Sequence, residues 1–301
     1  MYRIVQKKYL WFTLSGLLLI PGAIFLVLGG LKPNIDFTGG TMWQLKFAAN
    51  RPTVQELETK LKELGLNNLT VQPVGDQGVT IRSQAIDNEK RVQLLQSIQE
   101  TYPGLAEEAY ETVGPTIGKE LKQRAVTAVI LVMLGIIFYI TFAFRKISKA
   151  TIIPSWVMGL AAIIALAHDM LFMLGLYAFL GYFYQVEVGA LFITALLTIL
   201  GFSVHDTIVV FDRIREHMLH GSGQDFETII NDSVNQTIAR SLNTSLTTIF
   251  VLTALYLFGG ESIRWFVFAM IVGIIAGTYS SIFIASPLLV IWQKIKSRKR
   301  S

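Results

Sequence analysis

The chain has 301 residues, of which 52% are hydrophobic and only 16% are charged, whereas roughly a quarter of the residues of a soluble protein are charged. Its mean hydropathy of +0.51 excludes an ordinary soluble protein and indicates a membrane protein. Cysteine is absent, which excludes disulfides, covalent haem attachment and thiolate metal sites.

Six stretches are long and apolar enough to cross a bilayer, which takes about 20 residues in a helix. They lie near residues 10–30, 125–144, 152–180, 188–210, 242–259 and 264–292. The first stretch starts like a signal peptide, with basic residues before an apolar core. Its apolar run exceeds the roughly 7 to 15 residues of a signal peptide, and no small-residue cleavage site closes it. We therefore expect a retained anchor.

Residues 31–124 differ in composition from the rest of the chain, because charged residues concentrate there and the periodic segments are short. The pattern predicts strands at 41–47, 69–74, 78–84 and 105–113, and helices at 52–65 and 87–102. Asp87 is the expected N-cap of the second helix. The resulting βαββαβ order is that of the ferredoxin-like fold, which hosts many functions and indicates none by itself.

Glycine and proline mark both ends of this small α+β domain. Gly39 and Gly40 follow the first span in NIDFTGGT, and Pro115 and Gly118 precede the second span in VGPTIGKEL. Because glycine permits sharp backbone turns, we predict two hinges that let the domain tilt as a unit. Ordinary structural turns are the alternative.

Basic residues are distributed asymmetrically over the predicted loops. With the N-terminus inside, the inner segments carry Arg3, Lys7, Lys8, Arg145, Lys146, Lys149, Arg213, Arg215, Arg240, Lys294, Lys296, Arg298, Lys299 and Arg300, whereas the short outer loops carry Arg264. Basic residues beside spans favour the cytoplasmic side. Both termini are therefore expected in the cytoplasm and residues 31–124 in the periplasm. This distribution accounts for the net charge of +5 and argues against nucleic-acid binding.

The fourth span runs into GFSVHDTIVVFDRIRE and carries His205 and Asp206. A carboxylate at the bilayer centre costs roughly 3 kcal/mol on insertion scales, so an intramembrane Asp is expected to face protein or water. At about 100° per residue, Asp206 shares a helical face with Ser203 and Thr207. His205 shares a different face with Thr198. We expect a central helix of the bundle.

The fifth span has a polar stripe formed by Arg240, Asn243, Thr244, Thr247 and Ala254. Arg240 lies at its cytoplasmic end, and Asp206 lies in the inner half of the preceding span. We therefore predict that Asp206 and Arg240 meet. Snorkelling of Arg240 to the lipid headgroups is the alternative.

The third span carries His168 and Asp169 in ALAHDMLF. By depth, Asp169 should lie farther out than Asp206, so the two carboxylates would form a relay rather than a direct pair. His, Asp and Arg residues strung across a bilayer fit a proton path, since ionisable groups within membranes mark such routes. A His–Asp pair that only bonds neighbouring helices fits the residues equally well.

Other chemistry has little support in the sequence. The chain lacks a P-loop, a nucleophile elbow, an HExxH motif and a dinucleotide fingerprint, so we predict no enzyme activity and no cofactor. The two His–Asp pairs lie on different spans, which argues against a metal site. Residues 211–236 read as an amphipathic, mixed-charge cytoplasmic segment that forms a solvated surface helix or contacts a partner.

Several long motifs resemble the SecF family of bacterial protein-export subunits. They are IDFTGG after the first span, HD in the third, GFSVHDTIVVFDRIRE at the fourth, RSLNTSLTT opening the fifth and LYLFGG after it. The resemblance covers nearly the whole chain. It implies an α-helical polytopic membrane protein of six transmembrane helices with an inserted ferredoxin-like periplasmic domain. The whole protein would form half of a transporter of the resistance-nodulation-division superfamily. The expected parts are residues 1–30, 31–124 and 125–301.

The resemblance also implies partners and roles. The partner subunit would be SecD, and the pair would work in the inner membrane beside the SecYEG channel, the ATPase SecA, YidC, YajC and the translocating preprotein. The proton-motive force would drive late steps of export. The family's intramembrane Asp maps onto Asp206, its fifth-span Arg onto Arg240 and its third-span HD onto Asp169. Position 205 is often Asn in the family, so the role of His205 stays open. Further candidates for the polar pathway are His168, His205, Asn243, Thr244 and Thr247.

Two other functions remain as alternatives. One is a stand-alone, proton-coupled transporter of small solutes, although six spans with one inserted domain look like half of the repeat that such transporters contain. The other is a passive scaffold of the translocon, in which an Asp–Arg contact only fixes packing. The coupling ion, H⁺ or Na⁺, and the stoichiometry with SecD are left open by the residues.

Overall fold

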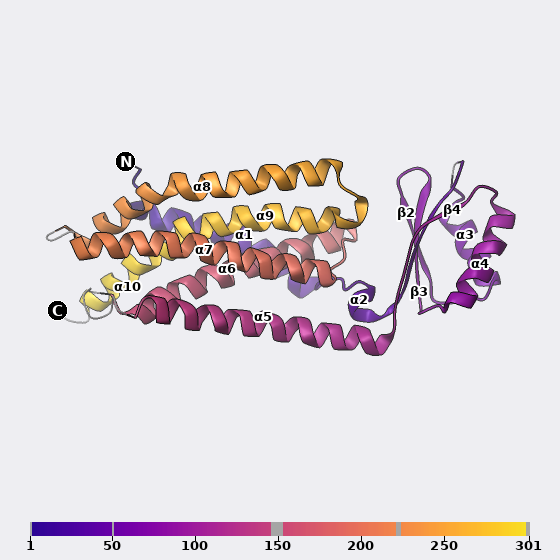
Figure 1. Ribbon diagram of the computed structural model, residues 1–301, viewed down its shortest axis with the longest axis horizontal. Helices are drawn as coiled ribbons and strands as arrows, with labels where there is room; N and C mark the ends of the chain where they lie inside the picture. The colour runs from indigo at the N-terminus through magenta and orange to yellow at the C-terminus, as the bar shows by residue number, and fades with distance from the viewer. Residues whose placement is uncertain (1, 50, 146–152, 221–223, 299–301) are drawn as a thin grey trace. The chain divides into compact units, whose positions relative to one another are not determined.

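The computed structural model describes residues 2–49, 51–145, 153–220 and 224–298 (Figure 1). Lys146, Lys149, Lys299 and Arg300, which contribute to the predicted charge asymmetry, lie outside these ranges. The chain divides into two compact units, residues 33–126 and the remainder. The smaller unit thus starts at Pro33 rather than at residue 31 and ends at Val126 rather than at residue 124.

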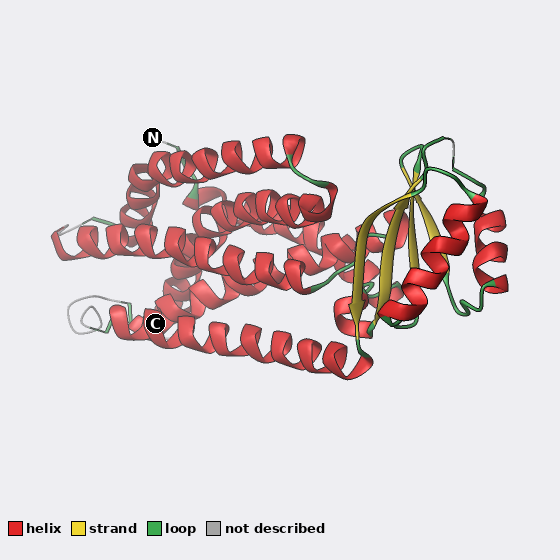
Figure 2. Ribbon diagram, turned by 45° about the vertical axis from the view of Figure 1, so that its right-hand side comes forward, coloured by secondary structure: helices red, strands yellow, loops and turns green. Residues whose placement is uncertain are grey.

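The smaller unit is a four-stranded antiparallel sheet covered by two helices (Figure 2). Its elements are α2 (Ile35–Thr38), β1 (Gly40–Lys46), α3 (Val54–Glu63), β2 (Thr70–Val74), β3 (Gly78–Ser83), α4 (Asn88–Thr101) and β4 (Ala106–Val113). The strand order β2-β3-β1-β4 confirms the predicted ferredoxin-like fold. Trp43 and Leu45 of β1 and Leu57 of α3 are fully buried in its core.

Local sequence signals fix the helix starts in this unit. Asp87 caps α4, as predicted, because its side chain accepts a 2.8 Å hydrogen bond from the Lys90 amide. The other helix begins with a capping box, in which Thr53 and Glu56 each accept a hydrogen bond from the other's backbone amide. The helix thus begins at Val54, after the Thr53 cap, and not at Pro52, where the sequence pattern predicted its start.

The larger unit is helical. Its elements are η1 (Val5–Lys7), α1 (Lys8–Leu28), α5 (Pro115–Ala143, from residue 127), α6 (Ser155–Tyr184), α7 (Ala190–His220), α8 (Phe226–Phe258), η3 (Glu261–Ile263), α9 (Arg264–Ser280), η4 (Ser281–Ala285) and α10 (Ser286–Arg298). Among the described residues, six helical segments are long and apolar enough to cross a membrane. They correspond to the six predicted spans, although α5 already begins at Pro115.

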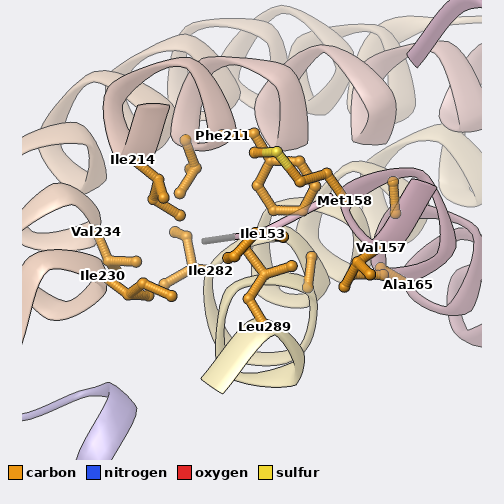
Figure 3. Packing of buried hydrophobic residues seen from close by; sticks show 14 of the residues in the cluster. Ile153, Val157, Met158, Ala165, Phe211, Ile214, Ile230, Val234, Ile282 and Leu289 are labelled. Atoms are coloured by element: carbon orange, nitrogen blue, oxygen red, sulfur yellow. The ribbon is translucent and has the colours of Figure 1, made fainter. Parts of the chain in front are cut away.

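Helices α7 and α8 continue well beyond the apolar stretches that revealed them, into residues 211–236. Phe211 and Ile214 on α7 are fully buried, as is Ile230 on α8, and they pack with Leu289 of α10 (Figure 3). The segment is thus amphipathic, as predicted, with its apolar face buried in the bundle. Its charged side chains do remain exposed, as in the 3.2 Å ion pair between Arg215 and Asp212.

Glycines allow the closest helix contacts in the bundle. A Cβ on Gly22 of α1 would lie 2.8 Å from the Cα of Gly175 of α6, so the two backbones touch there. On α9, a Cβ on Gly273 would clash with Ile199 of α7, and one on Gly277 would lie 2.9 Å from the Ser203 Cβ. Small residues at such spacing let membrane helices approach closely, and α9 is thereby brought against the polar face of α7.

Candidate functional site

Helix α7 presents its two polar faces in different environments. Ser203, Asp206 and Thr207 are buried. His205 and Thr198 lie on the exposed side, and 61% of the His205 side chain is accessible. The two faces predicted from helical geometry are therefore correct, and the carboxylate is the one that points into the bundle.

Asp169 is fully buried where α6, α7 and α9 meet. Its Oδ2 accepts hydrogen bonds from Ser203 Oγ at 2.6 Å and from Ser280 Oγ at 2.7 Å. His168 Nδ1 lies 3.1 Å from the other carboxylate oxygen. The carboxylate is thus hydrogen-bonded by three side chains, as a buried charged or polar group requires.

A π-helical turn brings a second serine into the same region. The turn, η4, spans five residues from Ser281, and Ser286 Oγ donates to the Ser281 carbonyl at 3.2 Å. Ser281 Oγ lies 2.8 Å from Thr207 Oγ1 and donates to the Ser203 carbonyl at 3.1 Å. Such turns occur frequently at functional sites. Ser280 and Ser281 are not among the candidates predicted from the sequence; the small polar residues in GTYSSIFIAS were the available signal.

Asp206 has a different set of partners. Thr278 Oγ1 on α9 donates to Asp206 Oδ2 at 3.2 Å and lies 2.5 Å from Ser245 Oγ on α8. His205 Nδ1 is 3.8 Å from the other carboxylate oxygen. Both buried carboxylates therefore contact hydroxyl groups of α9. In the described part of the chain, no side-chain hydrogen bond joins them, and their action as a relay stays a prediction.

The structure does not bring Asp206 and Arg240 together. Helix α8 turns its small residues Ser241 and Ser245 into the bundle, which leaves the neighbouring Arg240 exposed. Within the described ranges, no ion pair shorter than 4.0 Å links the Arg240 guanidinium to Asp206. The rest of the predicted stripe is also exposed, namely Asn243, Thr244 and Thr247.

A shallow groove runs between the exposed polar faces of α7 and α8. It has a volume of about 470 Å³ and is lined by Thr198, Gly201, Phe202, His205 and Thr244. Polar groups exposed on membrane helices ordinarily face protein or water rather than lipid. Polar side chains of both helices are thus exposed on this side of the bundle, beside apolar surface.

One ring nitrogen of His168 is buried without a hydrogen bond to any described residue. This nitrogen is Nε2, and the side chain as a whole is also buried. The ring centroid lies 6.2 Å from that of Tyr279 on α9, whose hydroxyl lies 3.1 Å from Ser15 Oγ on α1. A buried, unpaired nitrogen is a natural place for a water molecule.

The four predicted hinge residues lie side by side within the smaller unit. A Cβ on Gly39 would lie 2.8 Å from Pro115 Cα, and one on Gly118 would lie 2.9 Å from the Gly39 nitrogen. Gly39 and Gly40 have φ of 71° and 122°, which favours glycine at both positions. The two joints thus form one packed junction, and rotation about it stays a prediction.

No cluster of three or more His, Cys, Asp or Glu side chains suited to a metal ion occurs in the ranges that the structure covers. The residues around Asp169 and Asp206 offer hydroxyl groups instead.

Comparison with known proteins identifies the family. The family model for the C-terminal part of the protein export membrane proteins SecD and SecF matches residues 93–295. The chain belongs to the SecD/SecF family. It is 45% identical to the protein translocase subunit SecF of Thermobaculum terrenum, over 97% of this chain and 94% of the relative. It is 41% identical to that of Anaerolinea thermophila, with the same two coverages of 97% and 94%.

Solved structures of the family agree with the fold. The crystal structure of SecDF from Thermus thermophilus, described as a translocon-associated membrane protein, matches with a TM-score of 0.83 and 34% identity over 97% of this chain. A SecDF structure in a super-membrane-facing form matches with a TM-score of 0.70 and 33% identity over 99% of this chain. The chain spans 39% of the first and 40% of the second of those longer chains.

Proposed function

We propose that this chain is an accessory membrane subunit of the bacterial Sec protein translocase and forms a pair with SecD. Its relatives of similar length are named translocase subunit SecF. The solved relatives named SecDF are single chains of which this chain spans about two fifths. A separate SecD subunit would supply the part of SecDF that this chain does not span.

The exposed polar face of α7 and α8 supports such a pairing and carries the proposal. His205 and Thr244 line the groove there, and Arg240 and Thr247 are exposed on the same helices. Leaving an arginine and several hydroxyl groups against lipid would be costly. We assign this face to the contact with the membrane part of SecD.

The pair would use the proton-motive force to assist late steps of preprotein export. Asp206 would bind and release the proton, and the fully buried Asp169 would be a second proton-binding residue. In the arrangement described above, Asp206 is held by Thr278. Approach of Arg240 would stabilise the ionised carboxylate in the alternate arrangement, and the movement of α8 that brings it there would couple the proton to the export step.

The remaining features of the proposal concern location and partners. The pair would lie in the inner membrane, with both termini in the cytoplasm and residues 31–124 in the periplasm, in keeping with the distribution of basic residues. SecYEG, SecA, YidC and YajC would be its neighbours. Tilting of the periplasmic domain about the junction of Gly39 and Gly118 would pull on the emerging preprotein.

Asp206→Asn tests the coupling role, because it keeps the size of the side chain and removes the titratable charge. We expect the variant to co-purify with SecD while export driven by the proton-motive force falls to the level of cells that lack this subunit. Asp212→Asn is the matched control on the same helix, since Asp212 is exposed and pairs only with Arg215 in the described structure. It should export normally.

Two results would contradict the proposal in different ways. Normal export by Asp206→Asn would leave Asp206 with a packing role only, as in a passive scaffold. Loss of co-purification with SecD in that variant, but not in the Asp212→Asn control, would place Asp206 in assembly rather than in coupling.

A further inference from the structure

Three polar side chains line one face of α8 at its inner end. Glu227, Asn231 and Asn235 recur at intervals of four residues, so they stand above one another on the helix. All three contact residues 2–8, which precede and begin α1 and which we call the leading segment. The set of contacts between this face and the leading segment is called the asparagine ladder below.

The two asparagines bind the backbone of the leading segment. Asn235 Oδ1 accepts from the Tyr2 amide at 2.8 Å, and its Nδ2 donates to the Tyr2 carbonyl at 2.8 Å. Asn231 Oδ1 accepts from the amides of Ile4 and Val5 at 3.0 and 3.3 Å. These amides stand at the start of a helical run, where backbone N–H groups have no partner within the helix.

A buried ion pair completes the ladder. Lys8 Nζ lies 2.9 Å from Glu227 Oε1, and the Lys8 side chain is only 5% exposed. Lys294 of α10 binds the second oxygen of the same carboxylate at 2.6 Å. Val5 and Asn231 are also buried. The hydrogen bonds of Asn231 are shielded from water in this way and are costly to break, because the groups left behind are unsatisfied. Those between Asn235 and Tyr2 are exposed.

The ladder links the start of α1 directly to α8, in addition to the contacts that both helices make with α9. Helix α1 touches α6 at Gly22 and Gly175 and contacts Tyr279 of α9 through Ser15. Helix α8 packs against α9 through Ser245. The polar contacts between α8 and the start of α1 that the structure describes all belong to the ladder. Helix α8 carries Arg240 a short way beyond Asn235, and α1 leads along the chain to residues 33–126.

We propose that Asn231 and Asn235 are positioning residues that make α1 and α8 move as one body during export. The inference rests on the proposed function, in which a movement of α8 carries Arg240 toward Asp206. The ladder would pass that movement to α1, and from there along the chain to the periplasmic domain. The contacts of the ladder would stay formed throughout export and would not break and re-form.

Asn231 and Asn235 use different side-chain atoms toward the leading segment. Substitution by Asp, which can only accept, should therefore be tolerated at position 231 and not at position 235. Asn231 uses only its oxygen toward the leading segment, so Asn231→Asp keeps both accepted bonds and should export like the wild type. Asn235 also donates, to the carbonyls of Tyr2 and Asn231, so Asn235→Asp would set a carboxylate against them. We expect Asn231→Ala, Asn235→Ala and Asn235→Asp to lose export driven by the proton-motive force while still co-purifying with SecD.

Amide hydrogen exchange in the purified complex with SecD gives a readout apart from export. The amides of Ile4 and Val5 should exchange roughly fivefold faster in Asn231→Ala, as expected for loss of one hydrogen bond, and at the wild-type rate in Asn231→Asp. Normal export by Asn231→Ala despite the faster exchange would overturn the inference, and so would unchanged exchange.

A crosslink tests whether the ladder stays formed during export or has to open. Tyr2→Cys combined with Asn235→Cys, in a chain without other cysteines, removes the asparagine and replaces it with a disulfide. Export should be restored when the disulfide is formed and lost on reduction. Export that is blocked by the formed crosslink, or not restored by it, would overturn the inference.

Asp206→Asn, assayed in parallel, distinguishes the two proposals. If Asp206→Asn loses coupled export and Asn231→Ala does not, the ladder inference fails and the proposed function stands. If Asp206→Asn exports normally, the proposed function fails, and the inference about the ladder falls with it.

Discussion

Ser280 donates a 2.7 Å hydrogen bond to the carboxylate of Asp169, across a separation of 111 residues in the chain. Ser203 donates to the same oxygen from another helix. Two hydroxyl donors on one oxygen fix the position of the carboxylate between three helices. Removal of either donor would leave a buried oxygen less well satisfied.

Ser280→Ala should therefore destabilise the purified complex with SecD by about 1–3 kcal/mol, the usual cost of an unsatisfied buried group. Thermal unfolding measures this. The control is Ser286→Ala, because the Ser286 hydroxyl donates only to the Ser281 carbonyl in the structure as described. If the Ser280 bond matters through Asp169, Ser280→Ala should cost much less in an Asp169→Asn background. Equal costs in both backgrounds would mean that Ser280 acts elsewhere.

Thr278→Val should impair coupling through Asp206. The substitution keeps the shape of the side chain and removes the hydroxyl that donates to Asp206 and contacts Ser245. We expect lower export driven by the proton-motive force, together with normal assembly. Thr278→Ser retains the hydroxyl and should export normally. A valine variant with wild-type export would show that Asp206 works without this donor.

The periplasmic unit should lose stability in acid through Glu107. The hydrogen bond from Arg91 holds the pKa of Glu107 below its usual value, and a second bond from Trp43 adds to this. A lowered pKa in the folded state means that the carboxylate stabilises the fold above its unfolded pKa of about 4.3, and that this stability is lost as the pH falls through the folded value.

Urea unfolding of residues 33–126, followed by the fluorescence of Trp43, would test this, since Trp43 is the only tryptophan in that range. Glu107→Gln should lower the stability at pH 7 and flatten its decrease below about pH 4. Glu108→Gln is the control, because Glu108 is half exposed in its 3.3 Å pair with Lys46. The same acid sensitivity in the Glu107→Gln protein would rule out Glu107 as its source.

The proposed orientation can be tested by labelling single cysteines. Gln84 lies in an exposed position after β3, and Gln224 lies in an exposed position before α8. Gln84→Cys should react with a membrane-impermeant thiol reagent added to the periplasmic side, and Gln224→Cys should react only after the inner membrane is permeabilised. The reverse pattern would invert the topology.

The six spans and the small domain could be predicted from sequence because both depend on local patterns. Apolar length reveals a membrane helix, and strand and helix periodicity gives the βαββαβ order. The two faces of α7 followed from helical geometry alone. These features need no knowledge of which helices are neighbours.

The contacts of the two carboxylates could not be predicted in the same way. The position of Ser281 depends on the π turn, which adds a residue to the last span and which hydropathy does not register. On α8, the predicted polar stripe is exposed, because the helix packs through Ser241 and Ser245. Which small residues allow close approach is decided by the neighbouring helix and not by the period of the pattern.

The crossing of α1 and α6 has a mechanical consequence. Gly22 and Gly175 bring two bare backbones into contact, and one turn farther along α1 the ring of Phe25 packs against three aromatic rings of α6. Any rocking of α1 would pivot about the glycine contact and move Phe25 across those rings. Gly22 lies nearer the Leu28 end of α1 than the Lys8 end, so the arm toward Lys8 is the longer one. A rocking motion would therefore convert a wide swing at the Lys8 end into a short, forceful one at the Leu28 end.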